Sequence, residues 1–191
     1  MSLSSLYELI LKRRTIRRFK QKKIKKKILI KIINAGRLAP SAGNLQPIEY
    51  ILVMDKKIND KIFENVKLGK YFEGWVVKEE ERPRYYVILI VNKNINKDYE
   101  FDCGCASENI CLAALSFGIG SCIIKSINKE KLKKIIGLKG NYDICNVIAL
   151  GYPDEKSVCT NLRGSVKYFR KGNTVYVPKR SLSKIVRLNK F

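Results

Sequence analysis

At residues 85–91 the sequence reads YYVILIV, a run that is apolar at nearly every position and rich in β-branched and aromatic side chains. A strand that faces water on one side alternates polar with apolar residues, whereas a continuous apolar run is typical of a central strand covered on both faces. We therefore expect residues 85–91 to form the middle of a sheet.

Other stretches predict strands around this one. They are bounded by prolines, glycines or charged residues and read IEYILVM (48–54), SCIIKS (121–126) and YDICNVIALGYP (142–153). Near the C-terminus, VKYFRKGNTVYVP (166–178) predicts a hairpin that turns around residues 171–173. Helical segments separate the strands but the tail is hairpin-like, so we expect a mixed sheet.

Apolar residues recur at helical spacing in five segments, which are residues 5–13, 24–38, 56–66, 102–118 and 128–136. The first is expected to begin with a capping box formed by Ser5 and Glu8. Asp102 and Asn128 are the expected N-caps of the last two helices, and Gly118 is expected to end the fourth.

The length of the chain limits how many domains it can form. With 191 residues, 46% of them hydrophobic, it can bury one sizeable core but not two comfortable ones. We expect a single domain over residues 1–191. Residues 69–84 have no clear period and include the only tryptophan, so we expect a mobile excursion there, and residues from about 160 to 191 are expected to form a C-terminal extension.

Apolar runs and cysteines bear on where the protein works. The longest apolar runs fall well short of the roughly 20 residues of a membrane span, and no signal peptide opens the chain. The six cysteines include no C-x-x-C pair, and there is no histidine. We expect a cytoplasmic protein with reduced structural thiols, no bound metal and no membrane partner.

The formal net charge of +22, from 39 Lys and Arg against 17 Asp and Glu, raises the possibility of nucleic-acid binding. The lysines are spread along the chain, arginine is the minority cation, and no zinc-finger or helix-turn-helix signature appears. A basic nucleic-acid-binding domain therefore stays as an alternative, and our main expectation is that nucleic acid is not a partner.

The stretch LKRRTIRRFK (11–20) carries six positive charges in ten positions. If the helix continues, Arg13 and Arg17 share a face, and Thr15 can add its hydroxyl to the same ligand. Arginine presents a planar fork that matches phosphate oxygens. Charge runs are also common on solvated faces, so the stretch by itself leaves both interpretations open.

A second stretch, LAPSAGNLQP (38–47), combines two prolines, small residues and amide side chains in a connection between a helix and a strand. Backbone can approach a ligand closely there, and the amides of Asn44 and Gln46 each supply a donor and an acceptor for the edge of a heterocycle. The alternative is an ordinary Asx-type turn.

The order and spacing of five motifs resemble the nitroreductase family of flavin mononucleotide enzymes. The motifs are RRTIR (13–17), APSAGNLQP (39–47), D-x-G-x-A-x-x-N-x-x-L-A-A (102–114), FGIGSC (117–122) and GYP (151–153). The resemblance covers most of the chain. It implies a three-layer α+β sandwich with a central mixed, mainly antiparallel sheet, built as an intertwined homodimer with flavin at the subunit interface.

The resemblance also implies an activity. The protein would be an FMN-dependent oxidoreductase that passes hydride from NADH or NADPH through the flavin to a small acceptor such as a nitroaromatic or a quinone, with ping-pong kinetics. The flavin carries the chemistry in this family, so no separate catalytic residue is expected. Other flavin reactions on the same fold, dehalogenation or flavin cleavage, are alternatives, as is a flavin carrier without turnover.

Cofactor-binding residues follow from the same resemblance. The phosphate and ribityl chain would be held by Arg13, Arg14 and Thr15. Arg17 would lie beside the N1 and C2 carbonyl edge of the ring, where negative charge collects on reduction. The partner subunit would contribute Pro40, Ser41, Ala42 and Asn44.

Two more segments complete the implied site. A loop over the ring near N5 would contain Ile124, Lys125 and Ser126, although many relatives have glycines where Lys125 and Ser126 stand. Lys179 and Arg180 match a basic pair that closes over the phosphate. For Asp102, helix capping is the preferred role, and for Tyr71 and Trp75 ordinary packing is preferred to a place in a lid.

Overall fold

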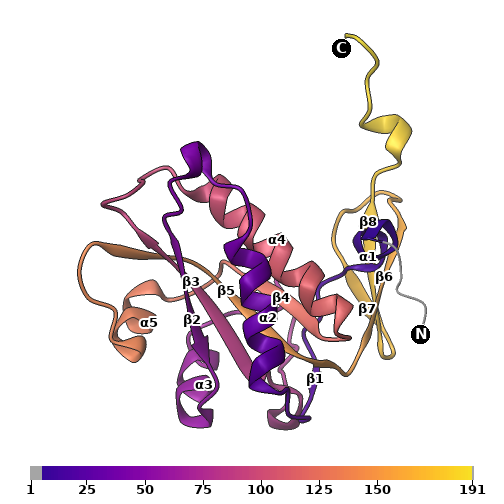
Figure 1. The fold of residues 1–191 in the computed structure, drawn as a ribbon. Coiled ribbons are helices and arrows are strands. Elements are labelled where there is room, and N and C mark those ends of the chain that lie inside the picture. Colours follow the sequence, from indigo (N-terminus) through magenta and orange to yellow (C-terminus); the bar gives the residue numbers. More distant parts are fainter. Residues whose placement is uncertain (1–5, 191) are drawn as a thin grey trace.

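A computed structural model of the chain describes residues 6–190. The centre of the main sheet is β3 (Tyr85–Asn92), which pairs with β2 (Ile48–Val53) on one side and β5 (Tyr142–Pro153) on the other (Figure 1). β4 (Gly120–Ile124) and the short β1 (Phe19–Lys20) both pair with β5. Every pairing between these strands is antiparallel, and Thr15 and Ser121 form an isolated parallel bridge.

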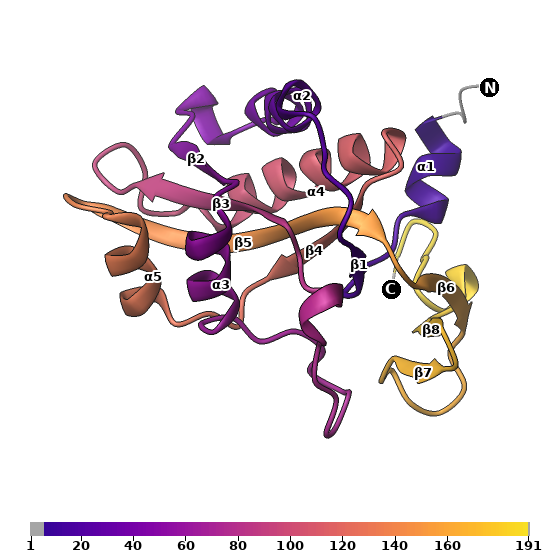
Figure 2. The same ribbon diagram turned by 90° about the horizontal axis from the view of Figure 1, so that it is seen from below.

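Helices cover both faces of this sheet, as Figure 2 shows. On one face lie α2 (Lys26–Arg37) and α4 (Glu100–Ser116), and on the other lie α3 (Lys56–Phe63) and α5 (Lys129–Ile136). β3 supplies both cores because successive side chains of a strand point to opposite faces. Val87 and Leu89 pack under α2 and α4, whereas Tyr86 and Ile88 pack against the other layer. The predicted α+β sandwich with a buried central strand is confirmed.

The helix pair α2 and α4 approaches closely at Gly36. A Cβ atom at this position would lie 2.7 Å from Ile110 Cγ1, so only glycine leaves room for that side chain. Two predicted helix ends also hold in the structure. Asn128 accepts a hydrogen bond from the Lys131 amide as the N-cap of α5, and Gly137 ends the same helix in the left-handed conformation, with φ of 66°.

Asp143 of β5 connects α5 to the sheet. Its carboxylate accepts hydrogen bonds from Lys129 Nζ at 2.7 Å, from the Tyr99 hydroxyl at 2.8 Å and from the Ile144 amide at 2.8 Å. Burial alone would raise the pKa of this carboxyl, but the hydrogen bonds outweigh burial and lower its pKa to about 2. The carboxylate is therefore charged at neutral pH and joins α5 to β5.

The prediction that Asp102 caps its helix is wrong. α4 begins at Glu100, after Tyr99 in the N-cap position, so Asp102 lies inside the first turn. Its side chain is buried and accepts a hydrogen bond from the Ala42 amide at 3.0 Å. A carboxylate is favoured in a first turn by the helix dipole, and here it also anchors the loop that follows α2.

A small second sheet contains β6 (Lys156–Asn161), β7 (Phe169–Lys171) and β8 (Thr174–Lys179). The predicted hairpin is confirmed as β7 and β8, which turn at residues 172–173. β6 was not predicted, since it is mostly exposed and has no strong apolar pattern. It pairs in parallel with β8, which is a contact that only the folded chain creates.

The first helix, α1 (Leu6–Lys12), covers most of the predicted range. The Ser5 half of the capping box lies outside the described residues. None of the residues of α1 is buried, and Leu6, Tyr7, Ile10 and Leu11 are all exposed. Beyond β8 the chain runs away from the body through a short turn of 3₁₀ helix, Leu182–Lys184 (Figure 1).

Two further expectations concern cysteines and membranes. All six cysteines are free, and Cys103, Cys111, Cys122 and Cys145 are buried, as expected for structural thiols. Within residues 6–190, no helix combines the length and apolar character that crossing a membrane requires.

Candidate functional site

The basic segment, residues 13–18, is extended rather than helical. α1 ends at Lys12, so the helix does not continue through this segment and Arg13 and Arg17 do not share a helix face. The segment lies beside the start of β4, where the Ile16 amide donates to the Ser121 carbonyl at 2.9 Å. This contact is one of those that hold the arginines against the sheet.

Two glycines make room for the basic segment. Gly120 and Gly151 pair with each other across β4 and β5. A Cβ atom on Gly120 would lie 2.9 Å from Ile16 Cγ1, and one on Gly151 would lie 2.8 Å from Phe19 Cδ1. The glycines of the FGIGSC and GYP motifs therefore seat the buried side chains that flank the arginines.

Arg13 and Arg14 line a cavity of about 180 Å³ together with Ser121, Glu155 and Ser157. Arg13 Nε forms an ion pair with Glu108 Oε1 at 2.6 Å, and the Arg14 guanidinium bonds to the carbonyl of Arg13. Arg14 Nε is buried and has no hydrogen-bond partner among the described residues. An anionic oxygen would satisfy this donor, so the residues present fit a phosphate group.

Arg17 is the most enclosed cation of the segment, with only 9% of its surface exposed. Its Cζ lies 4.3 Å from the centroid of the Tyr168 ring and 5.6 Å from that of Phe72. Arg17 Nε is buried without a hydrogen-bond partner in the described chain. The Arg17 guanidinium is thus screened from water, and its Nε–H remains available to donate a hydrogen bond.

The rings around Arg17 come from two distant parts of the chain and make up an aromatic cluster, defined here as Tyr71, Phe72, Trp75 and Tyr168. Within it, the centroid of Phe72 lies 5.2 Å from that of Trp75 and 5.1 Å from that of Tyr168. Residues 69–84 are thus packed against the segment that enters β7. From sequence, ordinary packing is the preferred role for Tyr71 and Trp75, and no local pattern links Phe72 or Tyr168 to Arg17.

The predicted N5 loop follows directly from β4. Ile124 is the last residue of β4, and its side chain is buried in the core and turned away from any ligand. Lys125 is exposed and forms an ion pair with Glu100 at 2.6 Å, which raises the pKa of this lysine. The basic segment contacts Ser121, and from Ser121 to Ser126 the chain spans at most roughly 16 Å. The basic segment and this loop therefore lie at the two ends of β4.

The predicted partner-facing loop, with Pro40, Ser41, Ala42 and Asn44, lies elsewhere in the protomer. It is anchored by Asp102 near the N-terminal end of α4, whereas Arg13 pairs with Glu108 farther along that helix. Figure 1 shows the loop after α2 at the opposite end of the molecule from α1 and β1. One protomer does not bring this loop together with Arg17.

Lys179 and Arg180 lie at the end of β8 and are exposed. Lys179 is opposite Asn161 of β6, four residues beyond Ser157, which lines the cavity at Arg13 and Arg14. The pair therefore belongs to the second sheet and not to the immediate surroundings of the basic segment.

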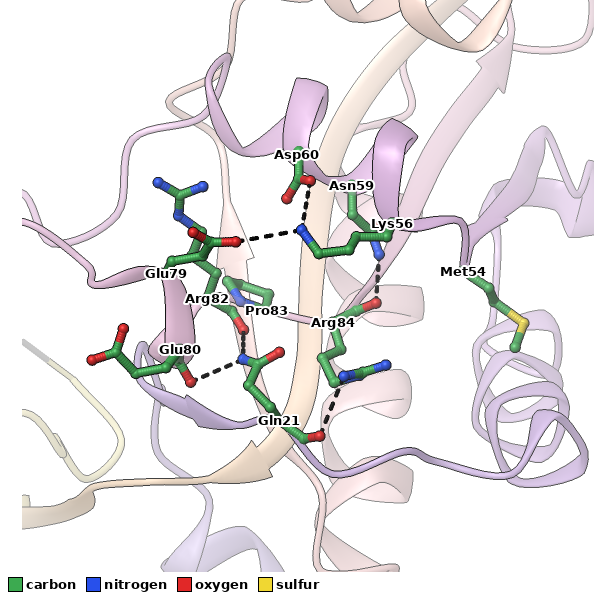
Figure 3. A pocket seen from close by; sticks show the side chains of 10 residues that line it. All are labelled: Gln21, Met54, Lys56, Asn59, Asp60, Glu79, Glu80, Arg82, Pro83 and Arg84. Carbon is green, nitrogen blue, oxygen red and sulfur yellow. Dashed lines mark hydrogen bonds and ion pairs between the residues drawn. The ribbon is translucent and has the colours of Figure 1, made fainter.

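Another cavity, of about 480 Å³, is formed by residues that no motif singled out (Figure 3). Its charges are largely paired with one another. Lys56 contacts both Asp60 and Glu79, and Gln21 donates to the carbonyls of Glu80 and Arg82. None of the predicted cofactor residues lines it. Among residues 6–190 there is also no group of three or more His, Cys, Asp or Glu side chains that could hold a metal ion.

Comparison with known proteins identifies the family to which this arrangement belongs. The sequence profile of the nitroreductase family matches residues 10–152. The chain belongs to the nitroreductase family. The predictions of family and fold are therefore confirmed.

Individual nitroreductase relatives agree with this assignment. A protein of Archaeoglobus fulgidus, provisionally named NADH dehydrogenase/NAD(P)H nitroreductase, is 32% identical over 158 residues, 78% of this chain and 86% of the relative. The iodotyrosine deiodinase of Thermotoga neapolitana is 25% identical over 173 residues, 80% of this chain and 91% of the relative.

A solved structure shows the same fold. It is a protein of Desulfovibrio desulfuricans, provisionally named a nitroreductase and solved in complex with FMN. Its TM-score with this chain is 0.72 at 20% identity, and the match covers 98% of each chain. At this identity the likeness establishes the nitroreductase fold of the chain and nothing finer.

Proposed function

We propose that this nitroreductase-family protein is an FMN-dependent oxidoreductase that passes hydride from NADH or NADPH to a small acceptor, such as a nitroaromatic or a quinone, in a ping-pong cycle. The observation that carries the proposal is the basic segment, in which separate arginines are held at separate places with buried donors unsatisfied. FMN, when bound, accepts hydride from the nicotinamide and gives up electrons to the acceptor.

The roles of the basic segment follow from its geometry. Arg13 and Arg14, with Thr15, would hold the phosphate end, because they line the small cavity beside Ser121. Arg17 would lie at the ring edge where negative charge develops. The Tyr168 and Phe72 rings exclude water from its guanidinium, and a fixed charge acts more strongly where the local dielectric constant is low.

The remaining predicted residues would complete the site around this segment. Lys125 and Ser126, with the backbone of Ile124, would cover the ring near N5. Lys179 and Arg180 lie outside the immediate surroundings of Arg13 and Arg14 in this protomer, so their approach to the phosphate is proposed on the resemblance alone. These roles are proposals that rest on the family motif at each position, and mutagenesis of the exposed basic pair would test whether it contributes to FMN affinity.

We also propose that the protein is a homodimer with flavin at the subunit interface. α1 exposes Leu6, Tyr7, Ile10 and Leu11, and the tail exposes Leu182 and Leu188, so both segments offer apolar side chains that a second copy could cover. The loop of residues 40–44 is remote from Arg17 in its own protomer, so a second copy can supply it. Sedimentation at several concentrations tests the dimer.

We also propose that the protein is located in the cytoplasm. Six free cysteines suit a reducing compartment, which favours the cytoplasm. Neither nucleic acid nor a membrane is proposed as a partner.

The experiment that tests the main proposal is a titration of the purified protein with FMN, followed by NADH and NADPH oxidation with a panel of nitroaromatics and quinones. Saturable flavin binding and acceptor-dependent oxidation of NAD(P)H are expected. Flavin binding without turnover would favour a carrier. A colourless protein that ignores FMN but binds duplex DNA with steep salt dependence would favour the nucleic-acid alternative.

Reductive dehalogenation is the second candidate, favoured by the match to the Thermotoga neapolitana iodotyrosine deiodinase over 80% of this chain. Iodide release from iodotyrosine by the reduced, FMN-loaded protein would support it. Rapid nitroaromatic turnover without iodide release would support the first candidate.

A further inference from the structure

One carboxylate outside the predicted site contacts the basic segment directly. Glu155 follows β5, and its side chain has no exposed surface. Its Oε1 accepts a hydrogen bond from the Arg17 amide at 2.5 Å and a longer one from the Arg18 amide at 3.3 Å. The two amides are adjacent in the chain, so this oxygen fixes the backbone on which the Arg17 side chain is mounted.

The other oxygen of Glu155 is bound to a cation from the C-terminal hairpin. Arg170 Nη2 lies 2.6 Å from Glu155 Oε2, and only 17% of the Arg170 side chain is exposed. A carboxylate without solvent contact is costly unless it is paired and hydrogen-bonded on both oxygens. Glu155 meets this requirement through the basic segment on one side and β7 on the other.

Arg170 continues the connection to residues 69–84. Its Cζ lies 5.0 Å from the Phe72 ring centroid and 5.2 Å from that of Trp75, within the range of cation–π contact. Tyr168, two residues before Arg170, is the residue whose ring lies over Arg17. The Glu155–Arg170 pair thus links the basic segment to the rings of Phe72 and Tyr168, which both lie near the Arg17 guanidinium.

A second tie runs in parallel with the first. The Arg18 guanidinium is paired with Glu81, a buried residue of the same excursion. Two contacts therefore connect the basic segment to residues 69–84: Arg18 with Glu81, and Glu155 through Arg170 with Phe72. Glu155 takes part in both, because it also accepts a hydrogen bond from the Arg18 amide.

We propose that Glu155 is the positioning residue of the site. Its carboxylate sets the backbone of Arg17, and through Arg170 it docks the aromatic cluster over the Arg17 guanidinium. The inference rests on the proposed function, because Arg17 is assigned to the flavin there. Glu155 lines the small cavity beside Arg13 and Arg14, but its two oxygens are bound to the Arg17 amide and to Arg170, so its influence on the flavin ring would pass through Arg17 and the cluster.

Glu155→Gln is the variant that tests this role. It keeps the size of the side chain and an oxygen acceptor but removes the charge that Arg170 requires. The matched control is Glu80→Gln, the same chemical change on an exposed residue of the excursion. Arg170→Lys is a second test with a milder perturbation, since it keeps the positive charge but loses the planar fork that pairs with Glu155 and stacks on Phe72.

The first readout needs no cofactor. Trp75 is the only tryptophan, so the intrinsic fluorescence of the protein reports on the aromatic cluster. We expect acrylamide to quench Trp75 more strongly in Glu155→Gln and in Arg170→Lys than in the wild type, with no change in Glu80→Gln. A purely structural ion pair would lower the melting temperature without changing Trp75 quenching in the folded protein.

The second readout is FMN affinity, measured by quenching of flavin fluorescence, together with the reduction potential of the bound flavin. Glu155→Gln should bind FMN about tenfold more weakly, which is the loss of one well-placed polar contact, and should shift the potential to a more negative value. Unchanged Trp75 quenching in folded Arg170→Lys, or FMN affinity of Glu155→Gln equal to that of Glu80→Gln, would overturn the proposal.

The design separates two failures. If the wild type does not bind FMN, the proposed function fails, and the Trp75 measurement still decides whether Glu155 docks the cluster. If FMN binds but folded Arg170→Lys leaves the Trp75 signal unchanged, the positioning role fails and the proposed function stands.

Discussion

Replacing Gly151 by alanine should displace the basic segment from the sheet. A Cβ atom at residue 151 would lie 2.8 Å from Phe19 Cδ1 and 3.0 Å from Phe19 Cβ, both well inside van der Waals contact. Phe19 has no exposed surface and so cannot swing into solvent. Overpacking of this kind in a well-packed core typically destabilises a protein by about 1–3 kcal/mol, which is the expected loss in free energy of unfolding.

A double-mutant cycle with Phe19→Leu tests the cause of that loss. Phe19→Leu alone leaves a cavity and should also destabilise the protein. In the double variant the smaller side chain makes room for the new methyl group, so the combined loss should fall short of the sum of the single losses by about 1 kcal/mol or more. Urea denaturation followed by circular dichroism measures all four free energies.

The same variant should weaken FMN binding, because Phe19 is two residues from Arg17 and its displacement moves the segment that carries the arginines. Additive single effects, or a Gly151→Ala protein as stable as the wild type, would refute the claim that this glycine seats the basic segment. Lost stability with unchanged FMN affinity would leave the packing argument intact and contradict its link to the cofactor site.

Three other predictions concern charge and capping. Arg17→Ala should lower the reduction potential of bound FMN and the turnover rate, with a smaller effect on FMN affinity. Arg13→Ala should mainly weaken FMN affinity. Potentiometry and FMN titration of both variants check this prediction, and the reverse pattern would contradict the assigned roles. Because the folded pKa of Asp143 is about 2, below the value of about 3.9 in an unfolded chain, its contribution to stability is present above pH 4 and is lost as the pH falls toward 2. The gap in unfolding free energy between wild type and Asp143→Asn should therefore shrink over that range, and a constant gap would argue against the ion pair with Lys129. Asn128→Ala removes the N-cap of α5 and should cost about 1 kcal/mol in urea denaturation, with a zero effect contradicting the cap.

Much of the fold could be predicted from local patterns. The continuous apolar run at residues 85–91 indicated a strand with two buried faces, and β3 supplies both hydrophobic cores. The N-cap at Asn128 and the hairpin turn at residues 172–173 could also be predicted, because caps and turns depend on residues only a few positions apart.

The parts that failed depend on distant partners. Asp102 looked like a cap, but its hydrogen bond goes to Ala42, 60 residues away. The spacing of Arg13 and Arg17 would place them on one helix face only if the helix continued, and docking of Ile16 against β4 keeps the segment extended instead. β6 has little apolar pattern of its own, and its pairing with β8 exists only in the folded chain.

By itself, the sequence determined the layered α+β class, the order of most strands and helices, and the family motifs that point to FMN, because each of these depends on the spacing of nearby residues. Only the tertiary structure decided what surrounds the arginines. Glu155 reaches Arg17 across 138 positions of the chain, and Tyr168 covers the same guanidinium from the segment that leads into β7. Contacts of this kind arise from packing, which brings together residues that no local pattern connects.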